Sequence, residues 1–314
     1  MKTKRYIFSI IVALSVMSGS VHADEITLPY KKLTLNANLV LAESKHLADG
    51  VVLITHGGLA HNRMEFVAYL QHLFKERGYN TLAINLSLGI DNRHGMYDCK
   101  VTHRHRNADA ADEIGAWLDW LKNHGVKQVV LLGHSRGGAQ TALYAAERDN
   151  SMVQAVVLMS PATSENNDAA EYQRRFNTPL MPVLEAAQKL VKEGRGDTVI
   201  HSVGLMNCVN TSATADSFVS YYEPNVSLDT PRLIPKFSKP VLVMVAGNDE
   251  VVVGLGKKVA PLVDGVRVQM KVIDGADHLY RDLYSDDAVD AIDAYLKQIS
   301  NSTFSITSSI SKSF

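Results

Sequence analysis

The chain has 314 residues, of which 46% are hydrophobic and 21% are charged, and this is enough for one large folded core. The formal net charge is only −1. Nucleic-acid-binding proteins show a basic excess that is missing here, so no nucleic-acid partner is predicted.

The first 23 residues have the pattern of a secretory signal peptide. Three basic residues precede an apolar run over residues 7–17, and the small residues Val21 and Ala23 precede a predicted cut after Ala23. The apolar run is short for a bilayer span. We therefore expect a periplasmic or secreted mature chain without a stable membrane span, and an uncleaved anchor is the less favoured alternative.

The chain contains two cysteines, Cys99 and Cys208. Outside the cytoplasm an even number of cysteines favours a disulfide, and we predict one between these two. The bridge would join the loop after an early strand to the middle of a later irregular segment. Two unpaired buried thiols are the alternative.

The mature chain begins with an alternating pattern over residues 26–43, which predicts an antiparallel hairpin. A continuous apolar run at residues 51–55 is typical of a parallel strand buried on both faces, and it ends in His56, Gly57 and Gly58. We interpret His56 as structural. A helix with Asn62 as its N-cap is predicted to extend to residue 77, and a strand is predicted over residues 79–86.

A long loop over residues 87–106 carries His94, His103 and His105. Aspartates and Cys99 lie nearby, so the loop contains residue types that bind zinc. The spacing is loose and Cys99 is expected in a disulfide, so no metal is predicted. The loop is also basic and would meet an acidic substrate if it overhung a site, but a solvated surface segment is the favoured interpretation.

The most informative stretch follows a helix predicted over residues 108–123 and is an apolar strand that runs into a Gly-x-Ser-x-Gly turn. Ser135 lies at its centre, between Gly133 and Gly137, and helix-forming residues follow. A serine hydroxyl is a weak nucleophile unless a sharp turn exposes it to a base. We therefore interpret Ser135 as a nucleophile. Another buried strand is predicted over residues 155–161, and helices that alternate with such runs indicate a parallel sheet.

The regular alternation stops between residues 162 and 235. One helix is predicted there, over residues 182–193, and the segment has no long apolar helix. A lipase that acts on fat droplets would need a larger apolar lid, so a small or moderately polar substrate is favoured.

Two late strands each end near a polar residue suited to catalysis. The run at residues 240–246 leads to Asp249, and the strand at residues 268–273 leads through a glycine turn to His278. A helix capped by Ser285 is predicted over residues 285–299, and a Ser-rich tail follows over residues 300–314.

The chain order Ser135, Asp249, His278, together with the Gly-x-Ser-x-Gly turn, resembles the α/β-hydrolase family. The resemblance extends over roughly residues 50–299. It implies an α/β fold with a mostly parallel central sheet and helices on both faces. The hydrolase domain would comprise residues 24–299, with a cap insertion at about residues 162–235.

The resemblance also implies a catalytic role for each motif residue. Ser135 would attack a carbonyl, His278 would take its proton, and Asp249 would orient and stabilise the histidine. The turn after Asp249's strand matches the family's acid turn better than the surroundings of its rivals, which are Asp229, Asp274 and Asp277. The oxyanion hole would combine the backbone amide of Arg136 with that of Gly58 or Leu59.

The predicted activity is hydrolysis of a small carboxylic ester through an acyl-enzyme, without metal or organic cofactor. A peptidase or amidase with the same triad is the first alternative. The second is a non-catalytic binding protein on the hydrolase scaffold, since a fold does not fix a function. The sequence gives no prediction of oligomeric state.

Overall fold

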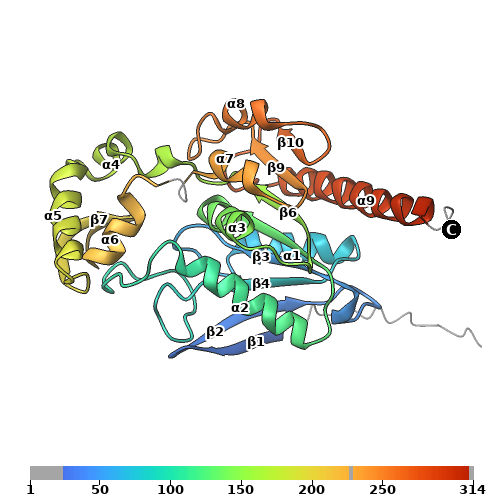
Figure 1. Cartoon of the computed structure of the whole chain (residues 1–314), viewed down its shortest axis with the longest axis horizontal. Helices are drawn as coiled ribbons and strands as arrows, with labels where there is room; N and C mark the ends of the chain where they lie inside the picture. Colours follow the sequence, from blue (N-terminus) through green and yellow to red (C-terminus); the bar gives the residue numbers. More distant parts are fainter. Residues whose placement is uncertain (1–23, 226–228, 311–314) are drawn as a thin grey trace, which may run out of the picture.

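The computed structural model describes residues 24–225 and 229–310, with side chains up to residue 301. The predicted signal peptide lies outside the described residues. Within them, no helix combines the length and the apolar character that a membrane span needs. Figure 1 shows a central sheet covered by helices, with a separate lobe at one end and the long C-terminal helix at the other.

The central sheet has eight strands in the order β1-β2-β4-β3-β5-β6-β9-β10. The first two strands form the predicted antiparallel hairpin, β2 pairs antiparallel with β4, and all other neighbours are parallel. The prediction of a mostly parallel α/β sheet is thus confirmed. The strands are β1 Asp24–Tyr30, β2 Leu33–Val40, β3 Val51–Thr55, β4 Thr81–Asn85, β5 Val129–His134, β6 Val153–Met159, β9 Val241–Ala246 and β10 Val268–Ile273.

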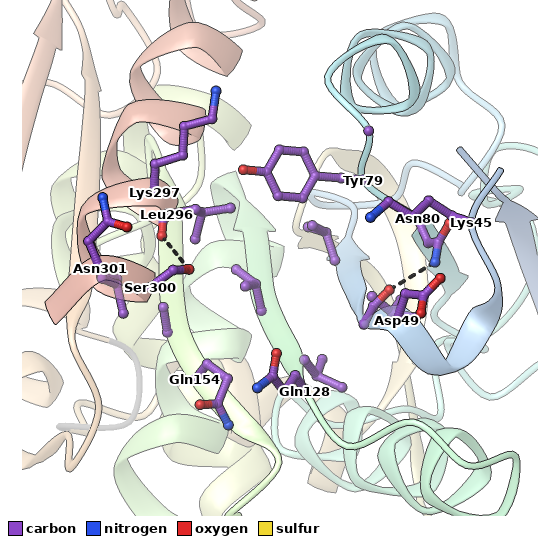
Figure 2. Close-up of a pocket in the computed structure, with 18 residues that line it drawn as sticks. Lys45, Asp49, Tyr79, Asn80, Gln128, Gln154, Leu296, Lys297, Ser300 and Asn301 are labelled. Atoms are coloured by element: carbon purple, nitrogen blue, oxygen red, sulfur yellow. Dashed lines mark hydrogen bonds between the residues drawn. The ribbon is translucent and has the colours of Figure 1, made fainter. Parts of the chain in front are cut away.

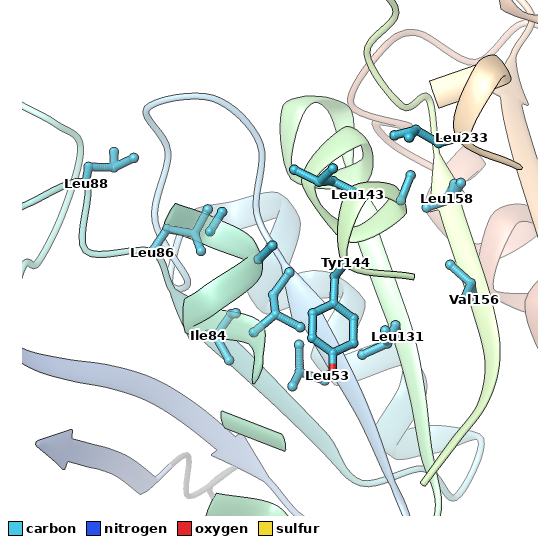
Figure 3. Packing of buried hydrophobic residues seen from close by; sticks show 14 of the residues in the cluster. Leu53, Ile84, Leu86, Leu88, Leu131, Leu143, Tyr144, Val156, Leu158 and Leu233 are labelled. Carbon is cyan, nitrogen blue, oxygen red and sulfur yellow. The ribbon is translucent and has the colours of Figure 1, made fainter. Parts of the chain in front are cut away.

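Helices cover both faces of the sheet because alternate strand residues point to opposite sides. In β3, Val52 and Ile54 pack with α1 (Glu65–Glu76) and α9 (Tyr284–Ile310). Val51 and Leu53 pack on the other face with α2 (Asp109–Asn123) and α3 (Ser135–Glu147). Figure 3 shows this second core, where Leu53, Leu131 and Tyr144 lie among the strands and α3.

Two helix starts differ from the sequence prediction. α1 begins at Glu65 with Met64 as its N-cap, because the Asn62 side chain instead donates a hydrogen bond to the Ala83 carbonyl, 3.3 Å away. α9 begins at Tyr284, and the Ser285 hydroxyl donates to the Tyr280 carbonyl rather than capping the helix. α9 also continues to Ile310, past the predicted end at residue 299.

The insertion between β6 and β9 contains more regular structure than the sequence indicated. A two-stranded antiparallel hairpin, β7–β8, and helices α4 and α6 were not predicted. Together with α5 they form the lobe at the left of Figure 1. The elements are η2 Ser164–Asn167, α4 Ala169–Phe176, α5 Leu180–Lys192, β7 Val199–Leu205, β8 Cys208–Thr214, α6 Ala215–Tyr222, α7 Thr230–Leu233 and η4 Ile234–Lys236. The remaining short helices are η1 Leu47–Asp49, α8 Leu255–Val259 and η5 Ala260–Leu262.

The 87–106 loop is joined to this hairpin. Cys99 and Cys208 form the predicted disulfide, with their Cα atoms 5.4 Å apart. The amide of His103 donates to the Ser212 carbonyl at 2.8 Å, and the Thr211 hydroxyl donates to the Cys99 carbonyl at 2.7 Å. The loop therefore lies beside β8 and pairs with it through one isolated parallel bridge, between His103 and Ala213.

Candidate active site

Ser135 lies on the sharp turn that the sequence predicted, between the end of β5 and the start of α3. Its φ is +56°, a left-handed value that is uncommon for a residue with a side chain. The turn is possible because strand and helix backbones approach closely at its glycines. A Cβ on Gly137 would lie 2.1 Å from the His56 carbonyl oxygen, and one on Gly133 would lie 2.6 Å from the Gly137 oxygen.

The three residues predicted as a triad form one hydrogen-bonded chain. His278 Nε2 lies 2.9 Å from Ser135 Oγ, and His278 Nδ1 lies 2.9 Å and 3.0 Å from the two carboxylate oxygens of Asp249. Asp249 comes from the turn after β9, and His278 comes from the turn after β10. The carboxyl ends of parallel strands meet at one edge of the sheet, which explains how residues so distant in sequence come together.

Asp249 is held as a charged carboxylate. Burial alone would raise its pKa, but the hydrogen bond and charge of His278 and the amide of Val252 outweigh burial and lower the pKa to about 2. One carboxylate oxygen also accepts hydrogen bonds from the amides of Val251 and Val252, both at 2.8 Å. An ionised, fixed carboxylate suits the role of orienting the histidine.

The three rival aspartates lie outside this chain of hydrogen bonds. Asp229 accepts a hydrogen bond from the Ser164 amide, Asp277 pairs with Arg281, and Asp274 is exposed. The structure thus places Asp249, and none of these rivals, at hydrogen-bonding distance from His278.

His134, for which the sequence predicted no role, contacts both the ring and the backbone carbonyl of His278. Its ring packs between Phe66 and His278, with centroids 4.7 Å and 4.9 Å away, and its Nε2 lies 2.8 Å from the His278 carbonyl oxygen. Burial first, and the charge of His278 second, lower the pKa of His134 to about 3. The ring is therefore neutral near pH 7, and its N–H donates to that carbonyl. Its place directly before the serine was the signal available in the sequence.

The His-Gly-Gly turn after β3 lies beside the serine. A Cβ on Gly57 would be 2.8 Å from the Ser135 Cβ, and Gly58 has a left-handed φ of +47°. Within the described part of the chain, the amides of Gly58 and Leu59 donate to no backbone carbonyl. Arg136 is the second residue of α3, where an amide has no acceptor within its own helix. Free donors thus lie on two segments adjacent to Ser135.

His56 has the structural role predicted for it. Its Nε2 accepts a hydrogen bond from the Leu86 amide at 3.1 Å, and burial together with the nearby Arg93 lowers its pKa to about 3.

The 87–106 loop differs from the prediction of a solvated segment. His103 and His105 are fully buried, His103 Nδ1 lies 3.0 Å from His105 Nε2, and His105 Nδ1 lies 2.8 Å from the Tyr221 hydroxyl. Other residues along the loop do face the solvent, among them His94 and Arg104. These histidines therefore pack the loop against α6. Among the residues with described positions, no cluster of three or more His, Cys, Asp or Glu could hold a metal ion.

A cavity of about 580 Å³ opens at the opposite end of the sheet from Ser135. Figure 2 shows it between the amino ends of the strands and α9, with Tyr79, Gln128 and Lys297 on its walls. It includes Val129, the first residue of β5, whereas Ser135 follows the last residue of that strand. This cavity is therefore separate from the hydrogen-bonded chain.

Comparisons with known proteins agree on the fold. The family model described as "alpha/beta hydrolase fold" matches residues 50–207, about half of the chain. Est1E from Butyrivibrio proteoclasticus is 19% identical, with a TM-score of 0.59 over 88% of this chain and 98% of its own. A monoacylglycerol lipase from Paleococcus ferrophilus is 18% identical, with a TM-score of 0.59 over 84% of this chain and 99% of its own. Among curated proteins no match was found.

Proposed function

The chain belongs to the α/β-hydrolase family, and we propose that it is a serine hydrolase that cleaves small carboxylic esters. The observation that carries this proposal is the continuous chain Ser135 Oγ, His278, Asp249, with both hydrogen bonds at 2.9 Å. Two proteins of similar structure are an esterase and a monoacylglycerol lipase, and both names describe ester cleavage by those proteins. This likeness supports the proposal as analogy.

The proposed reaction has two halves. Ser135 Oγ attacks the ester carbonyl carbon while His278 Nε2 takes its proton, and Asp249 stabilises the imidazolium. His278 then gives that proton to the leaving alkoxide, which departs as the alcohol and leaves the acyl-enzyme. Water then attacks the acyl carbon while His278 takes one of its protons. The bond between the acyl carbon and Ser135 Oγ breaks, His278 returns that proton to Ser135 Oγ, and the acid is released.

The negative charge of each tetrahedral intermediate needs donors already in place. We assign the amide of Arg136 and that of Gly58 or Leu59 to this role, because these amides lie beside Ser135 on two different segments. The loss of one such donor typically lowers kcat by about 100- to 1000-fold.

The test is hydrolysis of p-nitrophenyl esters of increasing acyl length by the purified protein and by Ser135→Ala. We expect turnover of short-chain esters that falls at least about 10⁴-fold in the variant, because removing a triad nucleophile leaves only binding and the oxyanion hole. Ser151→Ala, an exposed serine far from the turn, is the matched control and should retain full activity. Wild-type turnover in Ser135→Ala would refute the role of Ser135. Inactivity on every ester, with cleavage of peptide or amide substrates, would favour a peptidase or amidase.

We also propose that the mature protein works in the periplasm or outside the cell. The Cys99–Cys208 disulfide supports this, since such bonds persist in oxidising compartments. Residues 1–23 support it by composition. N-terminal sequencing of exported protein should find Asp24 as the first residue, and a retained Met1 would argue for an anchor.

A further inference from the structure

Arg136 directly follows the proposed nucleophile, and its side chain lies between α3 and the insertion. One of its terminal nitrogens donates a hydrogen bond to Asn167 Oδ1 at 2.8 Å. Its guanidinium lies over the Tyr221 ring, 5.5 Å from the centroid. Asn167 comes from η2 and Tyr221 from α6, so the guanidinium contacts two parts of the insertion.

The charge of Arg136 has no acidic partner. The residue is only 8% exposed, yet across residues 24–225 and 229–301 no carboxylate lies within ion-pair distance of it. The ionisable groups that influence it are Tyr221, Tyr222 and the cation Arg175, and His105 on the facing loop is held neutral by burial, which lowers its pKa to about 3. A buried charge without a partner is strongly unfavourable.

Another buried arginine shows how a purely structural guanidinium is satisfied. Arg93 is 4% exposed and donates to the carbonyls of Leu86, Gly95 and Ala60 and to the Asn85 side chain. Among the residues that the structure describes, Arg136 has a single such acceptor, although a guanidinium carries five N–H donors. None of its nitrogens is among the fully enclosed atoms without a partner, so its remaining donors keep access to solvent.

From this contrast we propose that Arg136 recognises a carboxylate on the substrate, so that the preferred substrates are esters with a second, anionic carboxyl group. A guanidinium binds a carboxylate through two parallel hydrogen bonds, and the amino end of α3 adds positive potential at the same place. This inference rests on the proposed ester hydrolysis and names its substrate class. The competing interpretation is that Arg136 only fastens the insertion to α3 through Asn167 and Tyr221.

The experiment compares esters that differ only in charge. Monomethyl succinate, glutarate and adipate are paired with methyl butanoate, pentanoate and hexanoate, in which a methyl group replaces the carboxylate, and turnover is followed by proton release in a pH-stat. We expect kcat/KM to be about 10- to 100-fold higher for the anionic member of at least one pair, as for a charge-assisted hydrogen bond. Equal values for all pairs would overturn the proposal.

Variants assign that preference to one side chain. In Arg136→Gln the ratio of anionic to neutral kcat/KM should fall to about 1. In Arg136→Lys, which keeps the charge but cannot form the two parallel hydrogen bonds, the ratio should be intermediate. Arg174→Gln removes the same charge from an exposed, Glu171-paired site on α4 and should keep the wild-type ratio. An unchanged ratio in Arg136→Gln would mean that Arg136 only holds the insertion against α3 and does not recognise the substrate. If Arg136→Gln does not fold, the ratio of anionic to neutral kcat/KM in Arg136→Lys, compared with that of the wild type, still tests whether Arg136 recognises the carboxylate.

A binding measurement separates this inference from the proposed function. Calorimetry with Ser135→Ala, which cannot turn the esters over, should detect monomethyl glutarate at least 10-fold tighter than methyl pentanoate, with the difference lost on adding Arg136→Gln. If neutral and anionic esters are hydrolysed equally well, the proposed ester hydrolysis is supported and carboxylate recognition by Arg136 is refuted. Selective binding of monomethyl glutarate without hydrolysis of any ester would support carboxylate recognition and refute the ester hydrolase. If no ester is hydrolysed and no selective binding is detected, both proposals are refuted.

Discussion

At the scale of single residues, burial and the number of nearby donors decide which groups near the site carry charge. His134 and His105 are enclosed and stay neutral, with pKa values lowered to about 3. Asp249 keeps its charge because His278 and two backbone amides face it. Glu113, on α2, is the opposite case among the acids. Burial raises its pKa to about 7, even though the Ser87 amide, 2.8 Å away, and the Ser87 hydroxyl donate to it.

This raised pKa predicts a pH-dependent stability term. The folded state holds the Glu113 proton up to about pH 7, whereas the unfolded chain releases it near the ordinary value of 4.5. The folded state therefore binds more protons between these values, and the free energy of unfolding falls as pH rises through this window. The loss attributable to Glu113 is about 2 to 3 kcal/mol between pH 5 and pH 8.

Glu113→Gln should remove that term while keeping the hydrogen bonds to Ser87. Urea unfolding at pH 5 and pH 8 would show a shallower pH dependence in the variant than in the wild type, by about 2 kcal/mol. Equal pH dependence in both proteins would mean that Glu113 ionises in the folded state as it does in the unfolded chain.

Residues differed in how far the sequence could assign them. Ser135, Asp249 and His278 were found because each follows a strand with a recognisable pattern, and the structure brings all three together. His134 and the side chain of Arg136 were not assigned roles, since their significance lies in contacts with Phe66, Tyr221 and Asn167, which are remote in sequence. Burial of His103 and His105 was missed for the same reason.

At the scale of elements, the site depends on how closely α3 approaches β3. Gly137 makes that approach possible, because a Cβ there would lie 2.1 Å from the His56 oxygen and 2.6 Å from the Thr55 oxygen. Both are backbone atoms, one in the last residue of β3 and one in the turn that follows it, and they cannot move aside as a flexible side chain would. The glycine pattern in the sequence therefore encodes a packing distance as well as a turn.

Gly137→Ala should consequently push α3 away from the sheet. We expect a loss of about 3 kcal/mol or more in the free energy of unfolding, as for severe overpacking, together with loss of ester hydrolysis. Gly256→Ala in α8 is the matched control, since its added Cβ would come no nearer than 3.7 Å to Val245, and it should unfold like the wild type. Denaturant unfolding of both variants makes the comparison. A Gly137→Ala protein as stable as Gly256→Ala would show that α3 has room to move.

Elements with strong periodicity were predictable, and elements defined by distant contacts were not. The buried strands and the amphipathic helices α1 and α2 appear where the apolar pattern placed them. The β7–β8 hairpin was missed because its register is irregular and Ser202, Met206 and Asn210 adopt positive φ, so no clean alternation marks it.

At the scale of the whole molecule, the disulfide links the two parts that the sheet alone does not hold together. Cys99 belongs to the 87–106 loop of the core and Cys208 to the β7–β8 hairpin of the insertion, 109 residues later. Asn207, next to Cys208, approaches the His-Gly-Gly turn, since a Cβ on Gly58 would lie 4.0 Å from Asn207 Nδ2. The bridge thus holds the tip of the hairpin beside the proposed oxyanion donors.

Removal of this bridge should affect stability and activity together. Closing a loop of this length in the unfolded chain is worth about 5 kcal/mol, which corresponds to a drop of about 10 °C in Tm for a protein of this size. We expect that drop in Cys99→Ser/Cys208→Ser, together with lower kcat/KM on short esters, because the hairpin tip is released from the turn beside Ser135. Thermal unfolding and ester assays with and without reductant measure both effects. The double variant is insensitive to reductant and serves as the control. If the reduced wild type kept both its Tm and its activity, the β7–β8 hairpin would be held by its packing against His103 and α6 alone, and the disulfide would contribute nothing to the site.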